Sequence, residues 1–262
     1  MIILETGGLT ISFGGVRAID GVDISIESDQ VFSIIGPNGS GKTTLFNLVS
    51  GIYTPDEGSI RIAGERVVGL APDQLARRGL SRTFQNLQIF SRMSVLENVM
   101  VGRHRHERTG ILADLLHWPS VACQNKATAE AAYAALDRVG LANSANRPAS
   151  SLAYGALKRL EIARALASEP KLLLLDEPAA GCNPVETQEI DGVIRSIVKD
   201  GITVVLVEHD MRLVMNISDR VHVLANGKTL AEGTPEQVRS DAAVIQAYLG
   251  VHGSQEAVRA VD

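Results

Sequence analysis

The sequence predicts an α/β protein built on a parallel β-sheet, and three observations indicate this fold class. A Gly-rich segment at 36–44 fits the phosphate-binding pattern G-x-x-x-x-G-K-[ST]. Two apolar runs, 172–175 and 202–207, are each followed directly by acidic residues. Segments with helical spacing of apolar residues alternate with these runs. Such alternation is typical of a parallel sheet with helices on both faces.

The phosphate-binding loop stands between an apolar strand at 31–35 and a helix at 44–49, which is the context that the motif requires. Glycines let the backbone curl so that N–H groups point at an anion, and the helix start adds partial positive charge. A chance match in a Gly-rich turn is the weaker interpretation, because motif, strand and helix agree. The sequence therefore predicts a P-loop NTPase. The residues expected to hold the nucleotide are Gly36, Asn38, Gly39, Ser40, Gly41, Lys42, Thr43 and Thr44.

Within this loop, Lys42 is expected to reach the terminal phosphates, and Thr43 is expected to offer its hydroxyl to Mg²⁺. Two acids follow the leucine run. Asp176 is expected to approach Mg²⁺ directly or through water, because ligands of parallel α/β sheets bind at the carboxyl ends of strands. Glu177 is then placed to polarise a water for in-line attack on the γ-phosphorus. A charged strand-to-loop edge is the alternative, and the nearby phosphate loop disfavours it.

Two further side chains at strand ends are candidates for contacts with the γ-phosphate, Mg²⁺ or the attacking water. Gln85 ends a strand where a helical segment begins, and its amide is able to contact Mg²⁺ or the attacking water. Position alone leaves this role and that of a surface glutamine about equally supported. His209 follows the second apolar run, and its imidazole is able to contact the γ-phosphate and hold Glu177 in place. Taken alone, a histidine at a strand end is more often structural.

Composition sets the limits of the fold. The chain has 262 residues, 45% of them hydrophobic, which suffices for one large domain or for a domain that carries a smaller subdomain. A net charge of −5 and a pI of about 5.7 give no overall electrostatic reason to expect nucleic-acid binding, although a local basic patch remains compatible with them. Cys123 and Cys182 have no metal or redox spacing, which suits a reducing compartment. With no signal-peptide pattern and no spanning apolar run, we expect any membrane role to need a partner.

The N-terminal part predicts a small antiparallel sheet. Residues 8–35 alternate apolar runs with turns at 14–15 and 28–29, and 58–64 reads as another strand of the same sheet. A short helix at 72–78 and a strand at 80–84 follow.

The middle of the chain predicts a helical insertion over 88–150. A capping box at 94–97 opens one helix, and the alanine-rich stretch 127–139 forms another. Between them, His104 and His106 lie in a charged run that we interpret as a solvated helix face rather than a metal site.

The α/β pattern returns with a helix at 157–166. Thr234 caps a final helix that reaches Leu249, and the last dozen residues are expected to fray.

These motifs together resemble those of ABC transporter ATP-binding subunits over nearly the whole chain. The family's markers appear in their usual order: the loop at 36–44, Gln85, a signature segment at 152–156, Asp176-Glu177, a loop at 180–183 and His209. The resemblance implies a RecA-like parallel core with an antiparallel β subdomain (1–87 and 157–235), a helical subdomain that carries the signature (88–156), and a C-terminal helix and tail (236–262). It also implies that Phe13 stacks on the adenine of ATP, with an ordinary sheet aromatic as the alternative.

The family further implies a head-to-tail dimer in which the signature of one subunit faces the ATP of the other. Ala153, Gly155 and Asn183 are the residues expected to serve the neighbour's nucleotide. Gly155 precedes a helix predicted to begin at residue 156, and a helix N-terminus attracts anions. Ala153 replaces the family's serine, Tyr154 a glycine, Ala156 a glutamine, and Asn183 the usual aspartate. We expect these changes to affect hydrolysis more than ATP binding.

Within the family, the chain is similar to the larger ATPase of bacterial branched-chain amino acid importers. The residues that carry this similarity are 84–90, the insertion through Trp118, 152–155, 178–184, 208–211 and 233–250. The resemblance implies a sister ATPase as partner, or a second copy of this chain, two permease subunits and, indirectly, a periplasmic solute-binding protein. It places the subunit peripherally on the cytoplasmic face of the inner membrane, with residues 85–98 carrying motion to the permeases.

Two alternatives are weaker. A soluble ABC-type ATPase that acts on DNA or ribosomes usually carries tandem halves, coiled coils or basic arms, whereas this chain has one half, no heptads and an acidic pI. A nucleotide-binding regulator with little turnover is suggested only by the altered signature. The transported solute does not follow from the sequence, because an ATPase subunit does not contact it.

Overall fold

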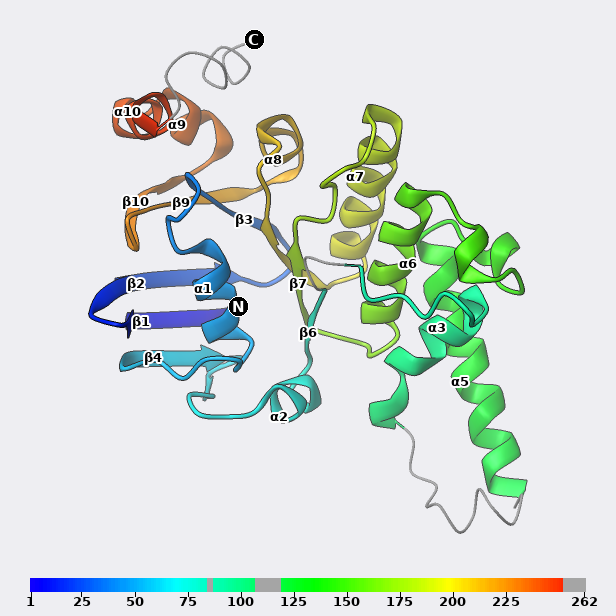
Figure 1. The fold of residues 1–262 in the computed structure, drawn as a ribbon. Helices are drawn as coiled ribbons and strands as arrows, with labels where there is room; N and C mark the ends of the chain where they lie inside the picture. Colours follow the sequence, from blue (N-terminus) through cyan, green and yellow to red (C-terminus); the bar gives the residue numbers. More distant parts are fainter. Residues whose placement is uncertain (84–86, 107–118, 252–262) are drawn as a thin grey trace.

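The predicted α/β class is confirmed. The computed structural model describes residues 1–83, 87–106 and 119–251, and these form two sheets and a lateral group of helices (Figure 1). The larger sheet has the strand order β10-β9-β3-β8-β7-β6. Neighbouring strands from β9 to β6 run parallel, and β10 is antiparallel to β9. The bounds of these strands are β3 (Val31–Ile35), β6 (Leu80–Arg82), β7 (Leu172–Asp176), β8 (Thr203–Val207), β9 (Arg220–Ala225) and β10 (Lys228–Gly233).

Both faces of the parallel sheet are buried, as the unbroken apolar runs predict. In β7, Leu172 and Leu174 pack on the side of the antiparallel sheet, whereas Leu173 and Leu175 pack on the opposite side. The opposite side is covered by α6 (Tyr154–Leu166), α7 (Pro184–Lys199) and α8 (Met211–Ile217).

The smaller sheet is antiparallel and has the order β2-β1-β4-β5. Its strands are β1 (Ile2–Phe13), β2 (Val16–Glu27), β4 (Glu57–Ile62) and β5 (Glu65–Arg66). Helix α1 (Lys42–Val49) lies between the two sheets, with Leu45 and Phe46 in their shared core (Figure 1). The prediction of one antiparallel sheet over 8–35 is right for β1 and β2. It is wrong for β3, which pairs with β8 and β9 in the parallel sheet because its side chains are buried on both faces.

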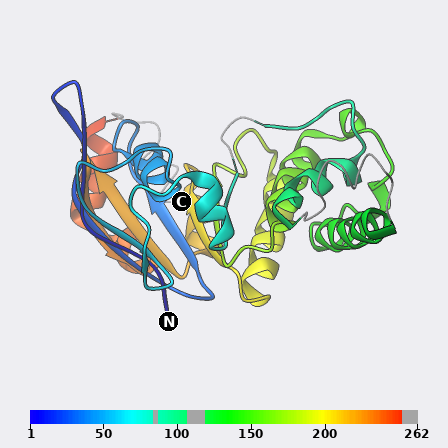
Figure 2. The ribbon, with the colours of Figure 1, turned by 90° about the horizontal axis from the view of Figure 1, so that it is seen from below.

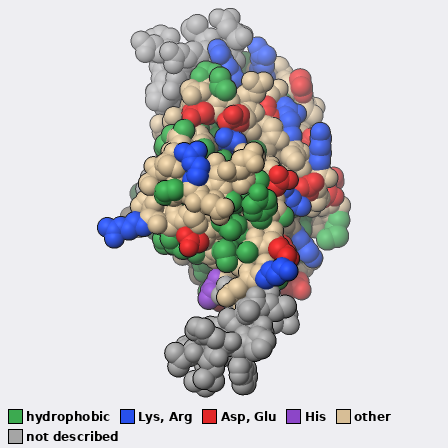
Figure 3. Space-filling model, turned by 90° about the vertical axis from the view of Figure 1, so that its right-hand side faces the viewer, with side chains coloured by type: hydrophobic (Ala, Val, Ile, Leu, Met, Phe, Trp, Pro, Cys, Tyr) green, Lys and Arg blue, Asp and Glu red, His purple; other side chains and the backbone are tan. Residues whose placement is uncertain are grey.

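Helices α3 (Val95–Gly102) and α5 (Pro119–Arg138), with the start of α6, stand to one side of the core (Figure 2). The predicted capping box opens α3: Ser94 Oγ accepts from the N–H of Glu97, and the Glu97 carboxylate accepts from the N–H of Ser94. Acidic and basic side chains are interspersed on the face at this end of the molecule, around a group of apolar side chains (Figure 3). The remaining helical turns are α2 (Pro72–Arg77), η1 (His104–His106), η2 (Ala142–Ser144) and η3 (Ala149–Ser151).

Two features are absent from the described residues, a cluster of metal-binding side chains and a membrane-spanning helix. No group of three or more His, Cys, Asp or Glu side chains that could hold a metal is found there, and His104 and His106 lie in the 3₁₀ turn η1. Among the helices of the same residues, none combines the length and the apolar character needed to cross a bilayer.

The C-terminal helix differs from its prediction. Instead of one helix from 235 to 249, the structure has α9 (Pro235–Ser240) and α10 (Ala242–Val251). Asp241 separates them in an extended conformation, and its carboxylate caps α10 by accepting the N–H groups of Ala243 and Val244. This break lets Val238 and Val244 both pack against the apolar side chains of β9. The tail from 252 onward, for which fraying was predicted, lies outside the described residues.

The helical subdomain should owe its stability to the face of α5 that packs on α3 and α6. Leu136 is 0% exposed there, so Leu136→Ala should leave a cavity and lower the free energy of unfolding by about 2–5 kcal/mol. Tyr133→Ala is the control on the same helix, because Tyr133 is 48% exposed and should cost less than about 1 kcal/mol. Urea unfolding followed by circular dichroism measures both, and equal losses would contradict the packing described.

Candidate active site

The phosphate-binding loop joins β3 to α1 in a conformation that two of its glycines make possible. Gly36 has φ +152°, and a Cβ there would lie 2.1 Å from the carbonyl oxygen of Leu224. Gly41 has φ +107°, and a Cβ there would lie 2.7 Å from the carbonyl oxygen of Ala18. Both positions combine a backbone angle that favours glycine with a close approach of another strand. The loop is thus wrapped tightly onto its neighbours, β2 and β9.

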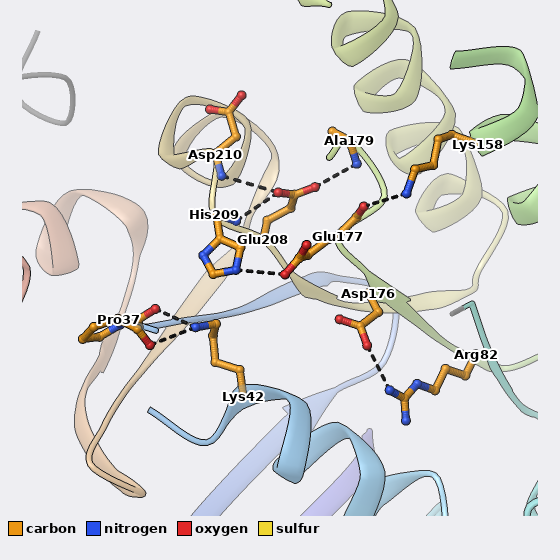
Figure 4. A network of polar contacts seen from close by, with 11 residues as sticks. Pro37, Lys42, Arg82, Lys158, Asp176, Glu177, Ala179, Glu208, His209 and Asp210 are labelled. Atoms are coloured by element: carbon orange, nitrogen blue, oxygen red, sulfur yellow. Dashed lines mark hydrogen bonds and ion pairs between the residues drawn. The ribbon is translucent and has the colours of Figure 1, made fainter. Parts of the chain in front are cut away.

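Lys42 is the first residue of α1, and its side chain is turned back into the loop. Nζ donates to the carbonyl oxygens of Gly36 at 2.7 Å and Pro37 at 3.1 Å (Figure 4). Burial lowers the pKa of Lys42, while the nearby carboxylates of Glu177 and Asp176 act in the opposite direction. The ammonium is therefore held by neutral partners inside the loop. A phosphate oxygen would be a stronger, charge-assisted partner for it.

Glu177 and His209 follow neighbouring strands and meet above the loop. Glu177 Oε1 lies 2.9 Å from Nε2 of His209 (Figure 4). Glu177 has φ +50°, a strained angle for a residue with a side chain. Its N–H donates to the carbonyl of Val207 at 2.9 Å, and its carbonyl accepts from Nζ of Lys158 at 3.2 Å, so the strained backbone is fixed at both ends. This geometry aims the carboxylate at the loop.

Glu208, which the sequence analysis did not single out as a site residue, is a buried carboxylate that holds this region together. It accepts the N–H groups of Ala179 at 2.8 Å, His209 at 2.9 Å and Asp210 at 3.4 Å. Burial raises the pKa of Glu208, and these backbone donors oppose the rise. The side chain thereby ties the loop after β7 to the loop after β8, the two segments that carry Glu177 and His209.

Asp176 ends β7 and is 2% exposed. Its Oδ2 accepts from Nη2 of Arg82 at 2.9 Å, and its other oxygen points toward Lys42 (Figure 4). Burial raises the pKa of Asp176, whereas the Arg82 guanidinium lowers it. One oxygen of the Asp176 carboxylate is thus bound to Arg82, and the other faces the phosphate-binding loop.

A cavity of about 570 Å³ lies over the loop. Predicted residues on its wall are Asn38, Gly39, Ser40, Gly41, Lys42, Thr43, Thr44, Glu177 and His209. Sequence reasoning missed Val16, Arg17, Ala18, Asn226 and Gly227, which complete the wall. The Asn226-Gly227 pair is a hairpin signal that could have revealed the β9–β10 turn, but its position over the loop depends on a tertiary hydrogen bond from the N–H of Gly227 to the carbonyl of Ser40.

Of the described residues predicted to hold this chain's own nucleotide, Gly36, Asp176 and Phe13 are not found on this wall. Gly36 and Asp176 are buried beneath it. Phe13 is 46% exposed at the tip of β1, where its ring packs edge-on against Tyr53 with centroids 5.3 Å apart. Gln85 lies outside the described residues.

The three residues predicted to serve a neighbouring subunit lie together away from this cavity, with Ala153 and Asn183 exposed and Gly155 buried. Ala153 is the N-cap of α6, and the helix begins at Tyr154 rather than at 156, so Gly155 lies within its first turn. The N–H of Gly155 donates to Oε1 of Glu186 at 3.1 Å, and the N–H of Asn183 donates to Oε2 of the same carboxylate at 3.0 Å. Glu186 therefore joins the signature segment to the loop at 180–183.

The donors of the site suit Mg·ATP. The hydroxyl of Thr43 and the carboxylate of Asp176 are hard oxygen ligands of the kind that Mg²⁺ prefers. The loop amides and the buried ammonium of Lys42 suit phosphates, and the cavity has the size of a nucleotide pocket.

A parallel core with this loop, an added antiparallel sheet and a lateral helical subdomain define an ATP-binding cassette. Residues 19–180 match the family model described as ABC transporter, and residues 228–254 match that of the branched-chain amino acid ATP-binding cassette transporters. The chain therefore belongs to the ABC transporter family, whose ATP-binding proteins bind and hydrolyse ATP to power transport. The resemblance inferred from the sequence motifs is thereby confirmed.

Individual relatives extend this match over almost the whole chain. The high-affinity branched-chain amino acid transport ATP-binding protein BraF of Pseudomonas aeruginosa is 48% identical over 249 residues, which cover 95% of this chain and 98% of that protein. The crystal structure of a nucleotide-free ATP-binding cassette from an ABC transporter has a TM-score of 0.83 at 34% identity and covers 95% of this chain and 99% of its own. A dimeric cassette in a post-hydrolysis state, bound to ADP and phosphate, has a TM-score of 0.74 at 25% identity, with 89% and 99% covered.

The close approach of Gly41 to the backbone of Ala18 can be tested without changing a charged side chain. Gly41→Ala should raise the dissociation constant for Mg·ADP at least about tenfold, a loss of about 1.4 kcal/mol, because the new Cβ would displace the loop from Ala18. Gly64→Ala is the matched control. Gly64 has a similar φ of +82°, no atom within 4 Å of its Cβ and a position in the β4–β5 turn far from the loop. Fluorescent-nucleotide titration measures both, and unchanged binding by the Gly41 variant would contradict the tight approach.

Proposed function

We propose that this chain is the ATP-hydrolysing subunit of an ABC importer for branched-chain amino acids or related amides and acids. One observation carries the chemical part of the proposal: the Glu177 carboxylate, fixed by His209 at 2.9 Å, faces the cavity whose floor is the Lys42 loop. BraF, the relative described above, is a transport ATP-binding protein for these solutes and supports the proposed solute class.

Each side chain has a role that follows from its position. The loop amides and Lys42 would bind the β- and γ-phosphates, and Thr43 and Asp176 would hold Mg²⁺, which would supply positive charge to the phosphates. Glu177 accepts a proton from the attacking water, and His209 keeps that carboxylate in place and contacts the γ-phosphate. Gln85 serves as a further contact to Mg²⁺ or water, and Phe13 stacks on the adenine.

Two such subunits act head to tail. The N-terminus of α6, with Ala153 and Gly155, and the loop residue Asn183 face the nucleotide bound by the partner. The ADP-bound cassette described above is a dimer, which supports the pairing of two such subunits. The partner is a smaller sister ATPase or a second copy of this chain. Because Ala153 lacks the hydroxyl of the usual serine, closure is weaker by about 1 kcal/mol per site.

The permease subunits dock in a cleft of about 830 Å³ between the core and the helical subdomain. Ile52 and Leu80 line it from the core, and Phe90 and Val101 line it from the helical side. A cleft with apolar walls from both halves suits an amphipathic helix of a permease loop on the cytoplasmic face of the inner membrane. The periplasmic solute-binding protein acts through the permeases and does not contact this chain.

The catalytic assignment predicts that Glu177→Gln retains Mg·ATP binding but lowers turnover by about 10²–10⁴-fold and traps a dimer. Glu189→Gln, at a half-exposed acid of α7, is the matched control and should hydrolyse normally. Steady-state phosphate release with the partner subunits present and size-exclusion chromatography with ATP are the measurements. Native turnover by the Glu177 variant would remove Glu177 from the mechanism.

The docking assignment predicts that Phe90→Glu lowers co-purification with permease subunits from detergent-solubilised membranes while Mg·ADP binding stays within about twofold. Phe90 is half-exposed in the cleft, and Tyr133→Glu places the same charge on α5 outside the cleft as a control. Recovery of ribosomal proteins or DNA instead of permeases would favour the soluble, non-transport ATPase.

A further inference from the structure

Arg82, at the end of β6, belongs to none of the motifs above, yet its guanidinium is bonded to the site residue Asp176 on one side and to the end of α1 on the other. Nη2 donates to Oδ2 of Asp176 at 2.9 Å, and the two side chains are 10% and 2% exposed. Nη1 donates to Oδ1 of Asn47 at 2.7 Å and to Oγ of Ser50 at 2.8 Å. The guanidinium also lies over the ring of Phe46, 5.5 Å from its centroid. Arg82 therefore connects the end of α1 to the end of β7.

This anchoring fixes the direction of the Asp176 carboxylate. The N–H of Asp176 donates to Oγ1 of Thr83 at 3.2 Å, so Arg82, which ends β6, and the residue after it hold one oxygen of Asp176 and its backbone. The other oxygen, Oδ1, has no hydrogen-bond partner in the described residues and points toward the Lys42 side of the site (Figure 4). Without the guanidinium, the carboxylate would be free to rotate about its side-chain bonds.

A purely structural role explains this ion pair poorly. Taking two charges out of water costs free energy, and well-packed apolar replacements of buried ion pairs are often neutral or stabilising. In addition, Nε of Arg82 is buried without an acceptor in the part of the chain that the structure describes. A buried, incompletely satisfied guanidinium is expected where it serves a site.

We propose that Arg82 is a positioning residue for the metal-binding carboxylate: by holding Oδ2 of Asp176, it keeps Oδ1 directed at the place where Mg²⁺ accompanies the bound phosphates. The planar fork of arginine is required, because it contacts Asp176 with one nitrogen and Asn47 and Ser50 with the other. The inference rests on the proposed role of Asp176 in binding the metal. Hydrogen bonds to metal-bound carboxylates commonly determine metal affinity in this way.

The test uses Mn²⁺ as a probe for the metal site of the full chain with ADP bound, followed by electron paramagnetic resonance. Arg82→Met should weaken Mn²⁺ binding about 10-fold or more and leave metal-free ADP binding, measured in EDTA, within about twofold. Arg82→Lys should show nearly the same loss, because its single ammonium cannot reproduce the fork. Arg103→Met removes another partly buried ion pair, that with Glu169 in the helical subdomain, and should leave Mn²⁺ binding unchanged.

Several outcomes would overturn the proposal. Native Mn²⁺ affinity of the methionine variant, full rescue by lysine, or an equal loss of metal-free ADP binding would each do so. If Arg82→Met fails to fold, Asn47→Ala decides, since it keeps the ion pair but loosens its anchor and should weaken Mn²⁺ binding in the same direction. Asp176→Asn separates the two hypotheses. If Asp176→Asn weakens Mn²⁺ binding and the Arg82 variants do not, only the positioning role of Arg82 is refuted. If Asp176→Asn binds Mn²⁺ with native affinity, the metal site itself is refuted.

Discussion

The in-register parallel pairing of β3, β8 and β7 is the constraint on which the site depends. Ile34 of β3 pairs with Val207 of β8, and Val207 pairs with Asp176 of β7, so the three strands end at one level. The phosphate loop, Glu177 and His209 follow directly from these ends. A shift of one residue in any of these pairings would turn the following side chains to the wrong face of the sheet. The positions of Lys42, Glu177 and His209 are therefore set by the pairing of apolar strands to which these three residues do not themselves belong.

The same geometry concentrates charge where water is scarce. Burial raises the pKa values of Asp176 and Glu208 and lowers that of Lys42, so each of these charges is held at a cost. Backbone carbonyls partly satisfy Lys42, and backbone N–H groups partly satisfy Glu208. Partners of this kind stabilise a charge without neutralising it. In the proposed function, a bound Mg·triphosphate would supply opposite charge to Lys42 and Asp176 at once, and part of its binding free energy would come from offsetting the desolvation cost of these two buried charges.

Local sequence was enough to predict the loop, the strand ends and the capping box at Ser94, because each depends on residues within one turn or one motif. The break of the last helix at Asp241 was missed, since Asp is an equally ordinary helix-surface residue, and only packing on β9 shows why the chain bends. Arg82 and Asp176 are 94 positions apart, and Gly155 and Glu186 are 31 apart. No local pattern encodes such pairs. They arise only once the sheet and the helical subdomain are assembled.

In the folded chain, two side chains also lie between the regions that the proposed function must connect, namely the nucleotide site and the cleft for the permease subunits. Arg82 and Thr83 both contact Asp176, and both line the cleft between the core and the helical subdomain. Beyond residues 84–86, the backbone N–H and carbonyl of Phe90 are both bonded to the buried side chain of Asn98, which belongs to α3. The cleft wall is thus bonded to Asp176, the last residue of β7, at one end and to α3 at the other. Because packed elements of this kind move as units rather than deform, a change in the direction of the Asp176 carboxylate and a displacement of α3 would both act on the wall of this cleft.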